Sequence, residues 1–369
     1  MGAIGKRIAA LLALLLLCGC GRTGEAGEVS APPPRTDAAS DSAPQSVTFF
    51  AMDTIMELKA YGSRAAEGLR DAEAEIARLE TLFSHTAKGS DVDRINAAGT
   101  AATTVSPETA RLLARALALG ARTGGALDVT VYPLVAAYGF PTQDYAVPPE
   151  AERRRLLALV DYREVTVDAD ANTVSFAREG MALSLGAVAK GYASQAVSDL
   201  LRGYGITSAL LTLGGNIQAV GAKPDGSPWR VAVQSPFDET AYAGILSVED
   251  CAVITSGGYQ RYFDAEENGE TVRYHHILSP ESGLPAYAGL SSVTIVTPDG
   301  LLGDALSTAL FVMGLDKAAD YWRAEGGFDA VFITDAGEAY ITEGLSGLYE
   351  PAEGFGAVKI IATQTEDSK

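Results

Sequence analysis

Residues 303–314, GDALSTALFVMG, are the most informative stretch of the chain. They predict a helix with an apolar stripe on one side and a polar pair, Asp304 and Thr308. Asp304 and Thr308 are four residues apart, so a helix places their oxygens on one face, one turn apart. Small neighbours allow a ligand to come close, and the unpaired N–H groups at a helix start favour phosphate. A carboxylate and a hydroxyl in this arrangement make half of a site for a hard metal ion.

A simpler interpretation of Asp304 stays open at this point. Aspartate is a common N-cap, so Asp304 could end the turn at residues 298–300 and begin the helix without binding anything.

The first residues predict export and lipidation. Lys6 and Arg7 precede an apolar run that is too short to span a bilayer, which is typical of a signal peptide. The ending LCGC at 17–20 resembles the bacterial lipobox, so we expect residues 1–20 to be a lipoprotein signal peptide ending at a lipidated Cys20. Cleavage of a simple secreted protein nearby is the alternative. Residues 21–46 lack large apolar side chains and are expected to be a disordered tether.

Charge and cysteine content exclude several classes of function. The chain has 47 acidic and 28 basic residues and a net charge of −19, which argues against nucleic acid or an anionic membrane surface as a partner. Contact with a bilayer would then be through the lipid, and a phosphate-bearing ligand would need a local cation. Once Cys20 carries lipid and Cys18 leaves with the signal, Cys251 stands alone and no intrachain disulfide can form.

The remaining sequence alternates strands and helices. Strands are expected at 47–61, 181–185 and 208–213, a one-face helix at 69–83 and a hairpin at 164–177. We expect a folded domain over 47–350 and a C-terminal tail over 351–369. No glycine-rich turn of the dinucleotide-binding spacing opens a βαβ unit, so a Rossmann domain is excluded.

Three further positions carry possible chemistry. Asp128 follows a glycine-permitted bend, where an aspartate that only forms the turn is equally expected. Lys190 follows a strand-glycine-helix junction and could contact phosphate. His275 and His276 are adjacent in a strand and face opposite ways, so at most one points into a site and the other is expected on the surface.

Seven short motifs occur in order along the chain: Met52-x-Thr54, Gly125-Ala-Leu-Asp128-Val-Thr, Leu185-Gly-Ala-Val-Ala-Lys190-Gly-Tyr, Leu213-Gly-Gly-Asn216, Thr255-Ser-Gly257, His276-Ile-Leu-x-Pro280-x-x-Gly283-x-Pro285 and Asp304-Ala-Leu-Ser-Thr308-Ala. This order, which runs over about residues 52–344, resembles the ApbE-type FAD:protein FMN transferases. The resemblance implies an enzyme that splits FAD, attaches FMN through a phosphoester to a Thr or Ser hydroxyl of a target flavoprotein and releases AMP.

The resemblance also implies site residues and partners. Mg²⁺ is expected at Asp304, Thr308 and the backbone carbonyl of Ala187. His276 matches the histidine beside the pyrophosphate and is preferred over Asp304 as general base, since a metal-bound carboxylate is a weakened base. The positions that match the lining of the FAD site are Met52, Ala126, Leu127, Asp128, Ser184, Lys190 and Ile277.

The expected fold is α+β, a mixed, largely antiparallel sheet core with flanking helices in two closely joined lobes with the active site between them. The acceptors are expected to be membrane-associated redox subunits, and the protein is expected on the extracytoplasmic face of the bacterial cell membrane. Ser184 and Gln195 stand where many family members have aspartate. Two alternatives remain: a Mg²⁺-dependent FAD pyrophosphatase that uses water in place of the hydroxyl, and a flavin-binding lipoprotein without turnover.

Overall fold

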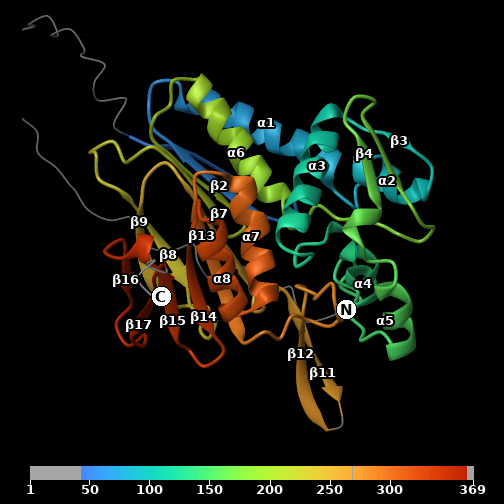
Figure 1. The fold of residues 1–369 in the computed structure, drawn as a ribbon. Coiled ribbons are helices and arrows are strands. Elements are labelled where there is room, and N and C mark those ends of the chain that lie inside the picture. Colours follow the sequence, from blue (N-terminus) through green and yellow to red (C-terminus); the bar gives the residue numbers. More distant parts are fainter. Residues whose placement is uncertain (1–42, 268, 364–369) are drawn as a thin grey trace, which may run out of the picture. The chain divides into compact units, whose positions relative to one another are not determined.

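The computed structural model describes residues 43–267 and 269–363. Cys20, the expected signal peptide and residues 21–42 of the expected tether lie outside the described residues. Within them, a nine-stranded sheet, three smaller sheets and eight α-helices alternate along the chain (Figure 1). The predicted α+β class is confirmed.

The large sheet forms the centre of the fold. Its strands in spatial order are β1 (Gln45–Ala51), β2 (Thr54–Ala60), β6 (Ala209–Leu213), β7 (Asn216–Val220), β10 (Ala252–Gly257), β13 (Leu290–Thr297), β14 (Asp329–Thr334), β15 (Ala339–Thr342) and β17 (Val358–Ile361). Neighbouring strands are antiparallel, except that β15 and β17 are parallel. The expectation of a largely antiparallel sheet is therefore confirmed.

The folded domain extends beyond the expected bounds of 47–350 at both ends. Gln45 pairs with Ala60 and Ser46 with Lys59, so β1 includes the last two residues of the expected tether. The expected tail contains β17, which pairs with β15, and the end of β16 (Tyr349–Pro351). Polar residues such as Gln45 join these strands because the bonds between strands are formed by backbone N–H and C=O groups. A hydropathy pattern does not detect these bonds.

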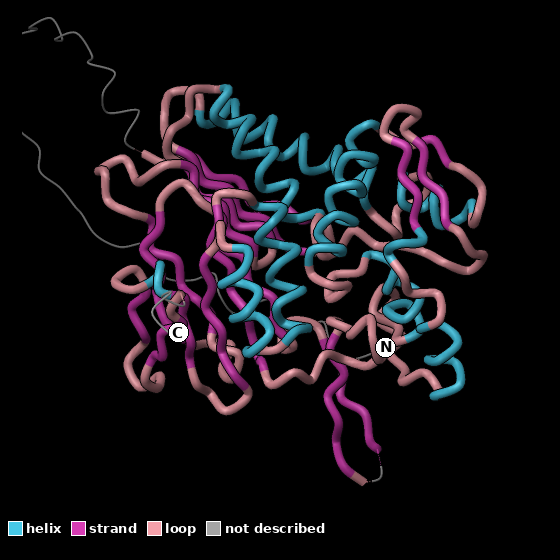
Figure 2. The backbone as a smooth tube through the Cα atoms, in the orientation of Figure 1, coloured by secondary structure: helices cyan, strands magenta, loops and turns pink. Residues whose placement is uncertain are grey.

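Two different layers cover the two faces of the large sheet. Along β14, Ala330 and Phe332 belong to the core beneath α7 (Gly300–Met313) and α8 (Leu315–Glu325), whereas Val331 and Ile333 face the opposite core. This alternation is the period of a strand buried on both sides. The helices α1 (Ala65–Phe83) and α6 (Ala189–Gly203) complete the helical layer, and β8 (Trp229–Gln234), β9 (Tyr242–Val248) and β16 form the opposite one. Figure 2 shows the helices lying against the strands of this sheet.

A smaller part of the chain packs beside the helices. It contains α2 (Asp91–Ala98), α3 (Pro107–Arg122), α4 (Tyr132–Ala137), α5 (Glu150–Leu157) and a sheet of β3 (Thr103–Thr104), β5 (Thr173–Phe176) and β4 (Val165–Asp168). Leu112 and Leu113 of α3 lie in the same hydrophobic core as Leu58 of β2. The smaller part therefore shares a core with the large sheet, while the hairpin of β11 (Tyr262–Glu267) and β12 (Glu270–His275) projects from the rest (Figure 1).

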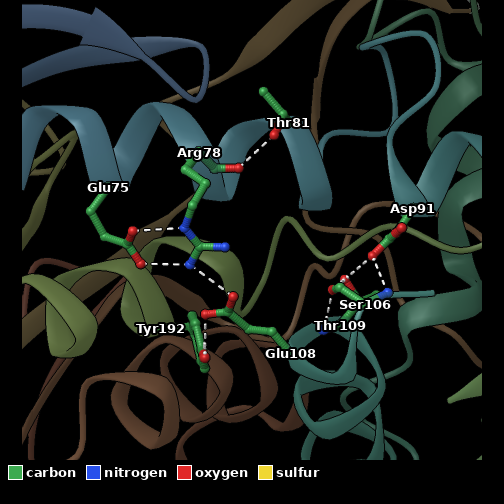
Figure 3. Close-up of polar contacts among 8 residues, drawn as sticks. All are labelled: Glu75, Arg78, Thr81, Asp91, Ser106, Glu108, Thr109 and Tyr192. Atoms are coloured by element: carbon green, nitrogen blue, oxygen red, sulfur yellow. Dashed lines mark hydrogen bonds and ion pairs between the residues drawn. The ribbon is translucent and has the colours of Figure 1, made fainter.

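Polar contacts fix α6 against α1 and α3 (Figure 3). Arg78 of α1 pairs with Glu75 at 2.6 Å and with Glu108 of α3 at 2.8 Å. Glu108 in turn accepts a hydrogen bond from the Tyr192 hydroxyl at 2.7 Å. Because Tyr192 lies in the first turns of α6, this network holds the start of that helix, which carries Lys190, in place.

Candidate active site

The helix predicted over residues 303–314 begins about one turn earlier than expected. α7 starts at Gly300, and its N-cap is Asp299, whose side chain accepts the Leu302 N–H at 3.1 Å. Asp299 also pairs with Arg115. The expectation that Asp304 stands at a phosphate-binding helix start is therefore wrong, and so is the simpler interpretation that Asp304 is the cap. Asp304 lies in the second turn, and its side chain needs another explanation.

Asp304 is held by the start of α6. Its Oδ2 accepts the Gly191 N–H at 2.8 Å, and the residue is 3% exposed. The two helices meet backbone to backbone here: a Cβ on Gly191 would lie 2.1 Å from the Gly300 carbonyl oxygen. A side chain at position 191 is therefore excluded. The positive end of α6, which has no side-chain N-cap, faces a buried carboxylate that would otherwise be costly.

Within the described part of the chain, this hydrogen bond leaves Oδ1 of Asp304 and the Ala187 carbonyl without a donor. In a regular helix the Gly191 N–H would bond to the carbonyl four residues earlier, that of Ala187. Among the described residues the Ala187 carbonyl accepts no backbone hydrogen bond, and no donor contacts Oδ1 of Asp304. Thr308 follows Asp304 by one helical turn, so a carboxylate, a hydroxyl and a carbonyl are available, which is the oxygen set that Mg²⁺ prefers. The residues present fit that ion.

Ser256 is a polar neighbour of this group that the sequence analysis did not select. Its Oγ lies 3.3 Å from Thr308 Oγ1 and 2.8 Å from Ser307 Oγ. Ser307 donates in turn to the Asp304 carbonyl at 2.9 Å. Ser256 is at the end of β10, within the Thr255-Ser-Gly257 motif, so that motif was the signal. These hydroxyls orient Thr308 from the sheet side.

Asp128 differs from Asp304 in having no free oxygen. Oδ1 accepts the Thr130 N–H at 2.8 Å and the Thr130 hydroxyl at 2.5 Å, while Oδ2 accepts the Tyr162 N–H at 2.9 Å. Burial raises the pKa of Asp128 despite these hydrogen bonds. Its side chain caps the short 3₁₀ turn at Val129–Val131, as the turn-forming alternative expected. The side chains of the two preceding residues pack in the hydrophobic core: Leu127 is 2% exposed, and Ala126 packs against the core that contains Leu127.

Ser184 sits in an extended segment that is not a strand. The expected strand at 181–185 is wrong: Leu183 exchanges hydrogen bonds with the Asn96 side chain, at 2.8 and 2.9 Å, and joins no sheet. Ser184 Oγ lies 3.3 Å from Nδ1 of His85, and the His85 ring is 4.7 Å from that of Tyr132. Burial lowers the pKa of His85, and this imidazole is a partner of Ser184 that sequence reasoning missed.

His276 directly follows the β11–β12 hairpin. Its ring is half-buried, and Nδ1 lies 3.2 Å from the Arg261 carbonyl, which also accepts the His276 N–H at 3.1 Å. Nδ1 must therefore carry the proton, which leaves Nε2 as the basic nitrogen. Burial is the main cause that lowers the pKa of His276 well below 6.5, and the positive charges of Arg261 and Lys190 lower it further.

His275 does not lie on the surface as expected. It is 6% exposed and contacts Phe311 and Tyr287 edge to face, so it belongs to the core beneath α7. Ile277 is likewise buried, at 5%, against that core. Of the segment 275–277, only His276 directs a polar side chain away from the core.

Met52 lies at a strained turn. Met52 and Asp53 form the two-residue turn between β1 and β2, with φ of 47° and 61°. Such turns normally take Asn or Gly, since other residues are strained at positive φ. The Met52 N–H bonds to Glu80 at 2.9 Å, and Asp53 pairs with Arg261. The turn is thereby tied to the segment that precedes His276.

Comparison with known proteins agrees with this arrangement. The family model described as "ApbE family" matches residues 52–332. An FAD:protein FMN transferase of Klebsiella pneumoniae is 36% identical over 80% of this chain and 90% of its own length, and one of Treponema pallidum is 35% identical over 76% and 82%. The crystal structure of the ApbE protein from Thermotoga maritima superposes with a TM-score of 0.77 at 30% identity, covering 83% of this chain and 99% of its own. The flavin transferase ApbE from Vibrio cholerae superposes with a TM-score of 0.74 at 27% identity, covering 83% of this chain and 99% of its own. The chain belongs to the ApbE family.

Proposed function

We propose that this protein is an FAD:protein FMN transferase that uses Mg²⁺ and attaches FMN to a Thr or Ser hydroxyl of an acceptor protein. The curated relatives carry this enzyme name, and the chain covers most of their length. The observation that carries the metal part of the proposal is the Gly191 N–H that bonds to Asp304 and leaves the Ala187 carbonyl free.

In the proposed reaction His276 is the general base. Its Nε2 accepts the proton of the acceptor hydroxyl, whose oxygen attacks the phosphorus of the FMN half. A phosphoester bond forms, the pyrophosphate bond breaks, and AMP leaves with the negative charge. Mg²⁺ held by Asp304, Thr308 and the Ala187 carbonyl would neutralise charge on the phosphate oxygens. Lys190, at the start of α6, supplies a fixed positive charge in a chain whose overall charge repels phosphate.

The direct test uses purified protein, FAD, Mg²⁺ and a candidate acceptor flavoprotein. The acceptor should gain the mass of FMN, with one AMP released per FMN attached. Release of AMP at an equal rate without acceptor, and no mass gain, would replace the proposal with the pyrophosphatase alternative. FAD binding without any AMP would favour the non-catalytic alternative.

The location of the protein is part of the proposal. Lipid on Cys20 would anchor it to the extracytoplasmic face of the cell membrane, near membrane-bound redox acceptors. Among the described residues, no helix is long and apolar enough to cross a bilayer. Cys20→Ser should abolish incorporation of labelled fatty acid and release the protein from the membrane fraction. An unmodified N-terminus downstream of residue 20 in membrane-derived protein would contradict lipidation.

A further inference from the structure

The segment between β10 and the hairpin brings Arg261 to His276. Arg261 lies immediately before β11, and its carbonyl contacts both His276 N and Nδ1, at 3.1 and 3.2 Å. The same residue therefore sets the tautomer of the proposed base through its backbone and carries a guanidinium into the same region.

The Arg261 guanidinium is oriented by one ion-pair partner, Asp53. Asp53 forms an ion pair with Arg261, and the described part of the chain offers its side chain no second carboxylate. A guanidinium has five N–H donors in a fixed fork, so one edge can hold Asp53 while the other stays available for a second anion. The backbone of Asp53 is held in the tight turn with Met52, between the paired strands β1 and β2.

The charge of Arg261 acts near the reaction centre. The positive charges of Arg261 and Lys190 both lower the pKa of His276, so both cations act on the same imidazole. Burial lowers the pKa of Arg261. A phosphate ligand would stabilise the charged guanidinium there.

We infer that Arg261 is a phosphate-binding residue of the FAD site, oriented by the ion pair with Asp53, and that it works together with Lys190. This inference rests on the proposed function for the identity of the ligand. It adds a residue that the seven sequence motifs do not contain, together with a reason for the strained Met52–Asp53 turn: the turn places the carboxylate that orients the arginine.

The β11–β12 hairpin supplies a matched control. Arg273 also pairs with an aspartate, Asp264, at 3.0 Å, and its side chain is 51% exposed against 49% for Arg261. Its guanidinium stacks on Tyr262, and Arg273 is not among the main causes that lower the pKa of His276. Arg261→Gln and Arg273→Gln therefore remove the same charge from the same neighbourhood, but only the first removes it from the site.

The experiment measures the FAD dissociation constant by flavin fluorescence without Mg²⁺, at low and high salt, with the melting temperature as a check on folding. Arg261→Gln should weaken FAD binding about tenfold or more at low salt, as expected for a charge-assisted hydrogen bond, and should reduce the salt dependence. Arg261→Lys should restore part of the affinity, and Arg273→Gln should stay within about twofold of wild type.

Equal affinities in the two glutamine variants, or a loss in Arg261→Gln with the wild-type salt dependence, would overturn the inference. The outcome is independent of turnover. If the wild type binds FAD but transfers no FMN, the proposed function fails while the Arg261 result still stands. If the wild type transfers FMN and Arg261→Gln binds FAD normally, only the inference fails.

Discussion

Asp128 and Asp304 are both buried aspartates, at 8% and 3% exposure, yet their hydrogen-bond partners differ. Asp128 satisfies both carboxylate oxygens with three donors from residues 130 and 162. Asp304 accepts the Gly191 N–H at Oδ2, and within residues 43–267 and 269–363 no donor contacts Oδ1. A buried carboxylate with both oxygens satisfied stabilises the local turn, whereas one with an unpaired oxygen can also bind a cation. The difference lies in the partners rather than in residue type or burial.

The largest effect should come from Asp304. Asp304→Ala removes the carboxylate proposed to hold Mg²⁺, so FMN transfer should fall by orders of magnitude while the fold is kept. Asp299→Ala is the control, because Asp299 caps the same helix and pairs with Arg115, and its loss should cost about 0.5–2 kcal/mol of stability without loss of rate. Near-normal transfer by Asp304→Ala at ordinary Mg²⁺ would show that the free oxygen is not functional.

His276→Ala should lower the transfer rate by about 10²–10⁴ while FAD still binds, since only the base is lost. The structure changes the expected pH profile: with the pKa of His276 well below its usual value, the ring stays neutral near pH 7. The wild-type rate should therefore rise with pH through a midpoint below about 6.5 and then stay level. A His276→Ala enzyme with the wild-type rate and profile would move the base to Asp304 or to water.

Asp128→Asn should affect stability more than catalysis. The amide keeps one acceptor oxygen, so a donor from Thr130 or Tyr162 is left without its partner in a buried place. The free energy of unfolding should fall by about 1–3 kcal/mol, while the transfer rate per folded molecule stays close to wild type. Denaturant unfolding and an activity assay normalised to folded protein separate the two. A large loss of rate with unchanged stability would place Asp128 in the chemistry.

The smallest effect concerns His275, whose pKa burial lowers to about 4. The folded state holds this ring neutral, whereas the unfolded chain takes up a proton below about pH 6.5. Stability should therefore be complete above pH 6.5 and decrease by about 1–2 kcal/mol as the pH falls toward 5. His275→Gln should reduce that decrease, which unfolding curves at pH 7 and pH 5 would show. An unchanged pH dependence would exclude His275 as its source.

Sequence patterns predicted the large elements of the fold because those elements are governed by periodicity and capping. The one-face helix α1 is an example. The segment at 181–185 looked like a strand by composition, but Leu183 pairs with the Asn96 side chain, a contact that no local pattern encodes.

The site was predictable in part. The motifs named Asp304, Thr308 and His276, but spacing along a helix could not show that Asp299 is the cap or that Gly191 donates to Asp304. The Gly191–Asp304 contact joins α6 to α7 across 113 residues, and only the folded chain reveals it. The burial of His275 was missed for a similar reason, because its partner Phe311 comes from another element.

The most direct test of the contrast between the two aspartates is the Mg²⁺ dependence of FMN transfer, measured by acceptor mass for the wild type, Asp304→Asn and Asp128→Asn at equal concentrations of folded protein. We predict that Asp128→Asn follows the wild-type Mg²⁺ curve. Asp304→Asn should lose transfer, or require far more Mg²⁺, because the amide offers no charge to the ion. Identical Mg²⁺ curves for wild type and Asp304→Asn would contradict the account.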